Sequence, residues 1–266
     1  MTISIATWNI NSVRLRIDLV CQFLKDYKPD ILCLQETKVA NDLFPHTPFE
    51  ELGYSHRAIN GQKGYHGVAT ISRLPFEATN MREFCGKGDT RHVSVTFNGG
   101  IELHNFYVPA GGDEPDPDKN EKFAHKLAFL EEMKDFFGKR KGKKTNKLIA
   151  VGDMNIAPLE NDVWSHKQLL KVVSHTPIEV EHLDRVMKAH SWQDVTRKFT
   201  PDTEKLYSWW SYRSRDWAES DRGRRLDHCW VTPALAEAPV SSEIIREARG
   251  WEKPSDHVPV ITTFKF

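Results

Sequence analysis

Short apolar runs recur along the chain, and polar or turn-forming residues bound each of them. Runs of this length that are rich in β-branched and aromatic residues predict strands. The Asn98-Gly99-Gly100 segment predicts a turn between two of them. The predicted strands are residues 3–10, 31–35, 67–72, 92–97, 101–109, 148–151, 206–212, 226–231 and 259–264.

Helical spacing of apolar residues occurs between these runs. Ser12 is placed to cap a helix that runs to about Tyr27, and a second helix is expected from about Lys119 to Phe137. Two polar helices are expected between Asn161 and Ala189. The apolar faces of the first two helices contain Val13, Ile17, Val20 and Leu24, and Phe123, Leu127, Leu130 and Phe137.

Strands that dominate, with helices between them, indicate an α/β protein. We expect two packed sheets with helices on their outer faces. The 266 residues, 39% of them hydrophobic, fit one large domain or two small ones. No internal repeat and no linker-like stretch divides the sequence, so residues 1–266 are predicted to form a single domain.

The location of the chain is predicted from what its sequence lacks. No apolar run approaches the roughly 20 residues that span a membrane, and the N-terminus reads as a strand rather than a signal peptide. A cytoplasmic protein is therefore expected. Cys21, Cys33, Cys85 and Cys229 form no CxxC pairs, which argues against zinc, and Cys33 and Cys229 are expected to be reduced core residues.

Charge is balanced, with 37 basic and 37 acidic residues, which alone argues mildly against a nucleic-acid partner. Its distribution matters more, since basic clusters occur at residues 139–144 and 222–225. The first cluster follows a predicted helix and is interpreted as a solvated loop.

Five polar clusters stand where predicted strands meet loops. They are Trp8-Asn9, Gln35-Glu36, Gly152-Asp153-Met154-Asn155, Leu226-Asp227-His228 and Ser255-Asp256-His257. Such distant residues meet only if their strands present these ends at one edge, which is a common way to build an active site. Carboxylates, amides and an imidazole favour cation-assisted chemistry on an anionic substrate.

The individual side chains leave alternatives open. Glu36 and Asp256 suit Mg²⁺ or Mn²⁺ as hard oxygen ligands, although Glu36 alone could be a solvated strand end. Asp153 and Asn155 lie on one side if the strand stays extended, and otherwise form a turn-capping Asp-x-Asn pair.

Asp256-His257 precedes a proline and an apolar strand. Asp227 could hold the second imidazole nitrogen, fix its tautomer and raise its basicity. Because no Gly-x-Ser-x-Gly motif supplies a serine nucleophile, water is the expected attacking group.

Several stretches together resemble the exonuclease III class of apurinic/apyrimidinic endonucleases, within the endonuclease/exonuclease/phosphatase fold. The resemblance covers residues 3–264. Gly-Asp-x-Asn and Ser-Asp-His mark the broad fold, whereas LQETK and YSWWSYRS indicate the DNA-repair branch in its bacterial form. The matching stretches are residues 7–11, 34–38, 105–109, 152–158, 207–214, 225–227 and 255–259.

The resemblance implies a four-layered α/β sandwich and a role for each matching residue. Glu36, Asn9 and Asp256 correspond to the main Mg²⁺ locus, and Asp153, Asn155 and His257 could form a second. Asp153 would orient or deprotonate water, Asn155 would donate to a phosphate oxygen, and Tyr107 would lie near the reacting phosphoryl group. Asp227 and His257 would bind and polarise the scissile phosphate. The residues expected to contact substrate are Asn11, Trp209, Arg213 and Leu226.

Two positions depart from the family pattern. Ala110 stands where many relatives carry Asn or Gln, and Arg224 where animal relatives carry Trp. Both concern substrate handling rather than the metal site.

The sequence therefore predicts a Mg²⁺-dependent nuclease, with Mn²⁺ as a possible substitute. It would act as a monomer on abasic sites and 3′ ends of double-stranded DNA, with no membrane partner. A phosphoesterase for a small molecule or lipid is the alternative enzyme, and a catalytically inactive DNA-binding module is the third interpretation.

Overall fold

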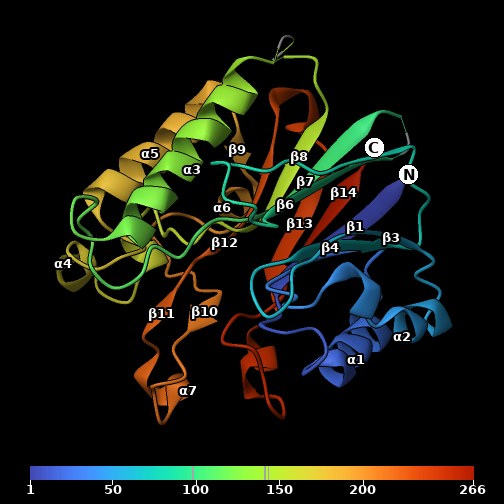
Figure 1. Ribbon diagram of the computed structural model, residues 1–266, viewed down its shortest axis with the longest axis horizontal. Helices are drawn as coiled ribbons and strands as arrows, with labels where there is room; N and C mark the ends of the chain where they lie inside the picture. The colour runs from blue at the N-terminus through green and yellow to red at the C-terminus, as the bar shows by residue number, and fades with distance from the viewer. Residues whose placement is uncertain (98, 141, 143) are drawn as a thin grey trace.

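The computed structural model describes residues 1–97, 99–140, 142 and 144–266. It contains two six-stranded mixed sheets that pack face to face, with helices on both outer faces (Figure 1). The predicted four-layered α/β sandwich is therefore confirmed. Asn98, in the expected turn, and Lys141 and Lys143, in the expected Lys-rich loop, lie outside the described residues.

The strands form the two sheets and a short ribbon. The first sheet has the order β13 (Pro239–Ile244), β14 (Val260–Lys265), β1 (Thr2–Asn9), β2 (Ile31–Gln35), β4 (Val68–Ser72) and β3 (His56–Asn60). The second has the order β5 (Ala78–Asn80), β6 (His92–Phe97), β7 (Ile101–Tyr107), β8 (Leu148–Asp153), β12 (Asp227–Val231) and β9 (Gln193–Asp194). The ribbon pairs β10 (Trp209–Trp210) with β11 (Gly223–Arg224).

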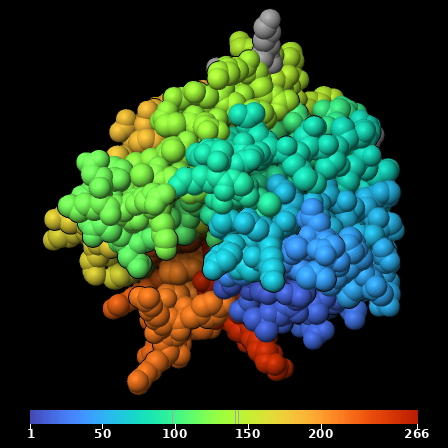
Figure 2. Space-filling model, viewed as in Figure 1, coloured from blue at the N-terminus to red at the C-terminus, as the bar shows by residue number. Residues whose placement is uncertain are grey.

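Helices cover the sheets and fill the connections. The α-helices are α1 (Ile17–Tyr27), α2 (His46–Glu51), α3 (Glu121–Gly138), α4 (His166–Leu169), α5 (Pro177–Ala189), α6 (Val195–Phe199) and α7 (Trp217–Ser220). Within the described residues, the 3₁₀ helices are η1 (Asn41–Leu43), η2 (Glu160–Asp162), η3 (Pro233–Leu235) and η4 (Arg246–Gly250). The segment with β10, α7 and β11, orange in Figure 2, projects from the body of the molecule.

Alternation along the strands sorts the apolar residues into layers. Ile31 and Cys33 of β2 face the core between the sheets, where Ile149 and Val151 of β8 meet them. Leu32 of β2 points the other way, into the cluster that packs against α1 and α2. The outer face of the second sheet packs in the same way against α3 and α5. Cys229 joins Cys33 in the middle layer, and all four cysteines are free, as expected for reduced residues.

Strand directions bring the polar clusters to one edge. β1 and β2 run parallel, as do β7 and β8, so each pair ends at the same side. β14 runs antiparallel to β1, and β12 antiparallel to β8, so both begin where their partners end. The polar strand ends therefore meet at one shared edge of the sheets, as the sequence predicted.

Two predicted element boundaries are wrong for identifiable reasons. Asn11 and Ser12 have positive φ angles of 49° and 87°, and the amide of Ser12 donates to the carbonyl of Glu36 at 2.7 Å. This pairing keeps residue 12 in the loop, so Ser12 is no cap and α1 begins at Ile17. The strand expected over residues 206–212 is only Trp209–Trp210. The amide of Leu206 donates to the carbonyl of Asn161, and the carbonyl of Ser208 accepts from the amide of Val258, so the preceding residues bond to other segments.

The remaining predictions differ less from the structure. α3 begins at Glu121, two residues later than expected, because the side chain of Asn120 caps it by accepting from the amide of Lys122. The two polar helices are α4 and α5. The strands β3, β5, β9, β11 and β13 were not predicted. Among the described residues, no helix combines the length and the apolar character that crossing a membrane requires.

A buried ionic cluster holds the start of β12. Arg225 is fully buried and forms two bonds to the carboxylate of Asp162, at 2.7 and 2.9 Å. Its remaining terminal nitrogen contacts Asp194 at 2.7 Å, and Arg197 contacts Asp162 at 2.6 Å. Because Arg225 stands two residues before Asp227, this cluster fixes the position of the backbone that leads to Asp227.

Asp162→Ala should destabilise the protein by about 3–5 kcal/mol, since it leaves a buried guanidinium without its main partner. Urea unfolding monitored by tryptophan fluorescence measures the change. Asp184→Ala is the matched control, because it removes an exposed ion pair to Lys188 that is worth roughly 1 kcal/mol or less. Equal losses in the two variants would show that the cluster does not stabilise this region.

Candidate active site

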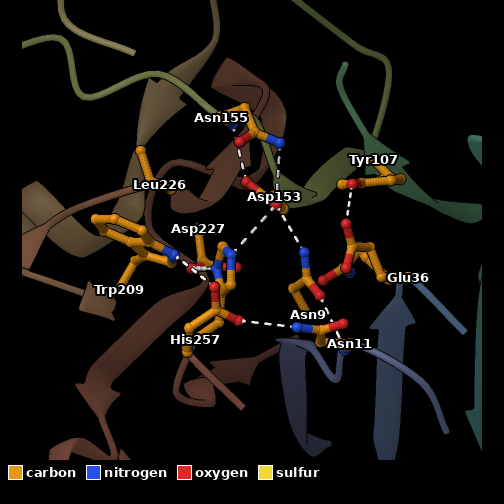
Figure 3. Close-up of polar contacts among 12 residues, drawn as sticks. Asn9, Asn11, Glu36, Tyr107, Asp153, Asn155, Trp209, Leu226, Asp227 and His257 are labelled. Carbon is orange, nitrogen blue, oxygen red and sulfur yellow. Dashed lines mark hydrogen bonds and ion pairs between the residues drawn. The ribbon is translucent and has the colours of Figure 1, made fainter. Parts of the chain in front are cut away.

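The polar strand ends line a cavity of about 540 Å³ at the shared edge of the sheets. Register brings Tyr107 and Asp227 opposite Asp153 on its two neighbouring strands (Figure 3). Two predicted site residues, Asp227 and Asn11, are not part of the lining. Asp227 lies behind His257, and Asn11 contacts Asp256 at the rim. The predicted site residues that line the cavity are Asn9, Glu36, Tyr107, Asp153, Asn155, Trp209, Arg213, Leu226, Asp256 and His257.

His257 is held between two carboxylates. Its Nδ1 lies 2.8 Å from Oδ2 of Asp227, and its Nε2 lies 3.6 Å from Oδ2 of Asp153. Burial alone would lower the pKa of His257, but the charges of Asp227 and Asp153 and the Asp227 hydrogen bond raise it to about 10. The imidazole is therefore a cation at neutral pH and can face an anion.

Ser208 positions Asp227, a role that the sequence did not reveal. Its hydroxyl donates to Oδ2 of Asp227 at 2.6 Å. It also accepts hydrogen bonds from the backbone amides of Leu226 and Asp227, both at 3.0 Å. The other carboxylate oxygen, Oδ1, is buried and has no hydrogen-bond partner. The only available signal was the position of Ser208 inside the YSWWSYRS stretch.

Asp153 and Asn155 form a turn, not an extended strand. Asn155 has a φ of 54°, and its amide donates to Oδ1 of Asp153 at 2.9 Å. Its side-chain nitrogen donates to Oδ2 of Asp153 at 3.1 Å and to the carbonyl of Val108 at 2.9 Å. The turn-capping alternative is therefore correct and the extended one wrong, yet both side chains still reach the cavity.

The Asp153 carboxylate is nearly free of solvent. Asn9 donates a further hydrogen bond to its Oδ2, at 2.8 Å. Burial raises the pKa of Asp153 to about 7, while the His257 cation and the donated hydrogen bonds oppose that rise. A carboxylate of this basicity is suited to orient or deprotonate water near neutral pH.

Glu36 occupies the opposite wall. The Tyr107 hydroxyl donates to its Oε1, and Lys38 lies 3.2 Å from its Oε2. Burial and the nearby carboxylates raise the pKa of Tyr107 well above its ordinary value. The phenol therefore stays protonated and acts as a donor.

Asp256 links the rim to the floor. It accepts from the Trp209 indole at 3.0 Å and from the Asn11 side chain at 3.3 Å. Trp209 thus faces the cavity while Trp210 is buried, as the opposite faces of a strand predict.

One group of ligand atoms within the described chain is close enough to hold a metal ion. It contains Asp153, Asp227 and His257, whose ligand atoms lie within 4.8 Å of one another. Oδ1 of Asp227 is buried without a hydrogen-bond partner. This group overlaps the expected second locus, with Asp227 in place of Asn155.

The outer part of the cavity is aromatic and cationic. Arg213 lies exposed at the rim on the projecting segment. Arg222 lies with its guanidinium carbon 4.7 Å from the ring centre of Trp164. Sequence reasoning did not identify Trp164 or Arg222 as cavity residues, because their places depend on the loop between β8 and α5.

Comparisons with known proteins agree with this geometry. Residues 6–257 match the Endonuclease/Exonuclease/phosphatase family. The chain is 32% identical to exodeoxyribonuclease III of Haemophilus influenzae, over 97% of this chain and 98% of the relative.

Two solved structures are similar throughout. An AP endonuclease from Archaeoglobus fulgidus has a TM-score of 0.91 and 34% identity, over 99% of this chain and 100% of the other. A 3′ phosphatase from Neisseria bound to product DNA hairpin has a TM-score of 0.89 and 29% identity, over the same shares. The resemblance predicted from the sequence is confirmed, and the chain belongs to the endonuclease/exonuclease/phosphatase family, in its exodeoxyribonuclease III branch.

Proposed function

We propose that this chain is a Mg²⁺-dependent DNA-repair nuclease. It hydrolyses phosphodiesters 5′ to abasic sites in duplex DNA and removes nucleotides or blocking groups from 3′ ends. The observation that carries the proposal is the buried Asp153–His257–Asp227 cluster, which opens into a cavity walled by Trp209 and Leu226. Because the chain belongs to the exodeoxyribonuclease III branch, we infer that the substrate of this cluster is a DNA phosphodiester.

Each residue of the cluster has a separate role in the proposed hydrolysis. Asp153 orients water and accepts its proton, and the Asn9 and Asn155 side chains hold that carboxylate in place. The His257 imidazolium, fixed by Asp227, faces the negative charge that develops on phosphate oxygens. Tyr107 is a neutral phenol on the opposite wall of the cavity, where its hydroxyl donates to Glu36.

The donor set of the cavity fits a hard divalent cation. Glu36 and Asp256 offer carboxylate oxygens and Asn9 an amide oxygen. Asp153 and Asn155 offer further oxygens, and His257 would complete this second set only as a neutral imidazole, which then no longer acts as the cation described above. Bound there, Mg²⁺ or Mn²⁺ would neutralise phosphate charge and lower the pKa of coordinated water.

Phosphoesterase action on a small molecule or lipid is disfavoured. The relatives named above are an exodeoxyribonuclease, an AP endonuclease and a 3′ phosphatase seen with DNA. Trp209 and Arg213 extend the cavity along a surface suited to a polymeric anion.

We further propose that residues 1–266 act as a single catalytic domain and as a monomer in the cytoplasm. Four free cysteines accord with a reducing compartment. Light scattering on the purified chain tests the monomer, and native protein in an unlysed extracellular fraction would contradict the location.

Wild-type protein should incise an abasic-site duplex with Mg²⁺ and lose that activity in EDTA. Asp153→Asn should reduce incision by roughly 10²–10⁴-fold, as expected for loss of a general base, while DNA affinity by fluorescence anisotropy changes little. Asp184→Asn is the remote acidic control. No Mg²⁺-dependent incision and no 3′ digestion by wild type would refute the function, and equal loss of binding and cleavage would refute the role of Asp153.

Arg213→Ala should weaken duplex binding and reduce the salt slope of affinity by about one, because a phosphate contact is lost. Arg215→Ala is the matched control, since it is an exposed arginine of the same segment outside the cavity lining. Anisotropy titrations at several salt concentrations measure both. Identical slopes for the two variants would make Arg213 a bystander.

His257 should titrate near pH 10 in metal-free protein, where Asp227 and Asp153 stabilise its cation. Because its folded pKa exceeds its ordinary value of 6.5, the stability it contributes is full below pH 6.5 and is lost as the pH rises through about 10. Nitrogen NMR of the ring measures the midpoint, and Asp227→Asn should move it toward 6.5. A wild-type midpoint near 6.5 would contradict this account.

A further inference from the structure

A buried ion pair joins α3 and α5 behind the active site. The ammonium of Lys126 contacts Oε1 of Glu179, and both side chains are completely removed from solvent. Lys126 lies among the buried residues of α3, which include Phe123, Leu130 and Met133. Replacing a buried ion pair by apolar residues of similar volume is often neutral or stabilising, so the stability of the helix packing does not explain why a lysine stands here.

The ammonium of Lys126 connects two loops of the active site. Besides Glu179, its Nζ donates to the carbonyl of Asn155 at 2.8 Å and to the carbonyl of Ala110 at 3.2 Å. Ala110 belongs to the loop that follows β7, and Asn155 to the loop that follows β8. An apolar side chain at position 126 could fill the same space, but it could donate to neither carbonyl.

Glu179 fastens a third loop to the same ammonium. Its carboxylate accepts from the amide of Ser174 at 3.0 Å and from the amide of Thr176 at 3.2 Å. The hydroxyl of Thr176 also donates to this carboxylate, at 2.5 Å, in the capping box of α5. Because the amide of Ala157 donates to the carbonyl of Ser174 at 2.8 Å, this loop in turn holds the segment that follows Asn155.

Asn155 transmits this arrangement to Asp153. Its backbone is in the left-handed region, with a φ of 54°, which persists where the surrounding contacts impose it. Its amide and its side chain hold the two oxygens of the Asp153 carboxylate. Since a misplacement of about 1 Å can cost roughly 100-fold in rate, the bond from Lys126 to the carbonyl of Asn155 bears directly on catalysis.

We propose that Lys126, paired with Glu179, is a positioning residue for the hydrolysis. Resting on the proposed function, this inference adds that the ammonium holds the turn of Asp153 and Asn155 against the loop of Ala110. Lys126 lines no part of the cavity and acts through the backbone of that turn. Its loss should therefore slow the chemical step and leave DNA affinity close to that of wild type.

Lys126→Met removes the donors to both carbonyls and keeps the length of the side chain. It should lower the single-turnover rate of abasic-site incision roughly 10- to 100-fold, with little change in DNA affinity by anisotropy. Met133→Ala is the matched control, because it removes core packing from the same buried face of α3 without touching the loops. Equal rate losses in the two variants, or a wild-type rate in Lys126→Met, would overturn the proposal.

A double variant separates positioning from stability. Lys126→Met leaves the carboxylate of Glu179 buried without its partner, which is strongly destabilising. Adding Glu179→Gln removes that charge and keeps an acceptor for the amides of Ser174 and Thr176. The double variant should regain melting temperature without regaining the rate. Rates are compared at a temperature at which every variant is folded, and recovery of both quantities together would overturn the proposal.

Hydrogen exchange in metal-free protein distinguishes this inference from the proposed function. The buried amide of Asn155 donates to Asp153 and reports the turn without DNA, while the amide of Val151 in β8 reports global opening. Relative to Val151, Asn155 should exchange roughly tenfold faster in Lys126→Met than in Met133→Ala. Equal ratios would overturn the inference alone. Wild-type protein that is inactive on abasic duplex with Mg²⁺ would instead overturn the proposed function, whatever the exchange ratios.

Discussion

A buried hydrogen bond between two amide side chains, Gln35 and Asn105, ties the sheets together beneath the active site. Nε2 of Gln35 donates to Oδ1 of Asn105 at 2.7 Å, and Asn105 donates in turn to the carbonyls of Leu34 and Ala69. A slip of one residue would leave these groups unpaired in an apolar core, at roughly 1–3 kcal/mol each. Since Glu36 follows Gln35 along the chain, the tie sets where that carboxylate meets the second sheet.

Further buried hydrogen bonds keep the active site rigid although its residues come from both sheets. The backbone of His257 accepts from the Trp8 indole at 3.0 Å, and the hydroxyl of Ser255 donates to the carbonyl of Asn9 at 2.7 Å. The first sheet thus holds the imidazole, while the second provides Asp153 and Asp227. Charges fixed in this way need no rearrangement when phosphate charge develops, which is the main advantage of a preorganised polar site.

The sequence predicted what depends on local pattern and on motif. The layered fold, the edge and the Asp227–His257 pair follow from periodicity and residue type. What failed depends on distant contacts. Ser12 was predicted to cap a helix from its local sequence alone. That prediction failed because the amide of Ser12 pairs with Glu36, which lies 24 residues away in sequence. The role of Ser208 depends on Asp227, which is near only after both sheets have formed.

The burial of Cys33 and Cys229 between the sheets has a chemical consequence. Burial raises the pKa of both thiols to about 12, so neither forms a thiolate at neutral pH. Oxidants attack the thiolate form, and here they would have to separate the two sheets first. Peroxides would thus leave these two thiols of the middle layer unoxidised as long as the sheets stay packed, whereas the half-buried Cys21 and Cys85 lie outside that layer.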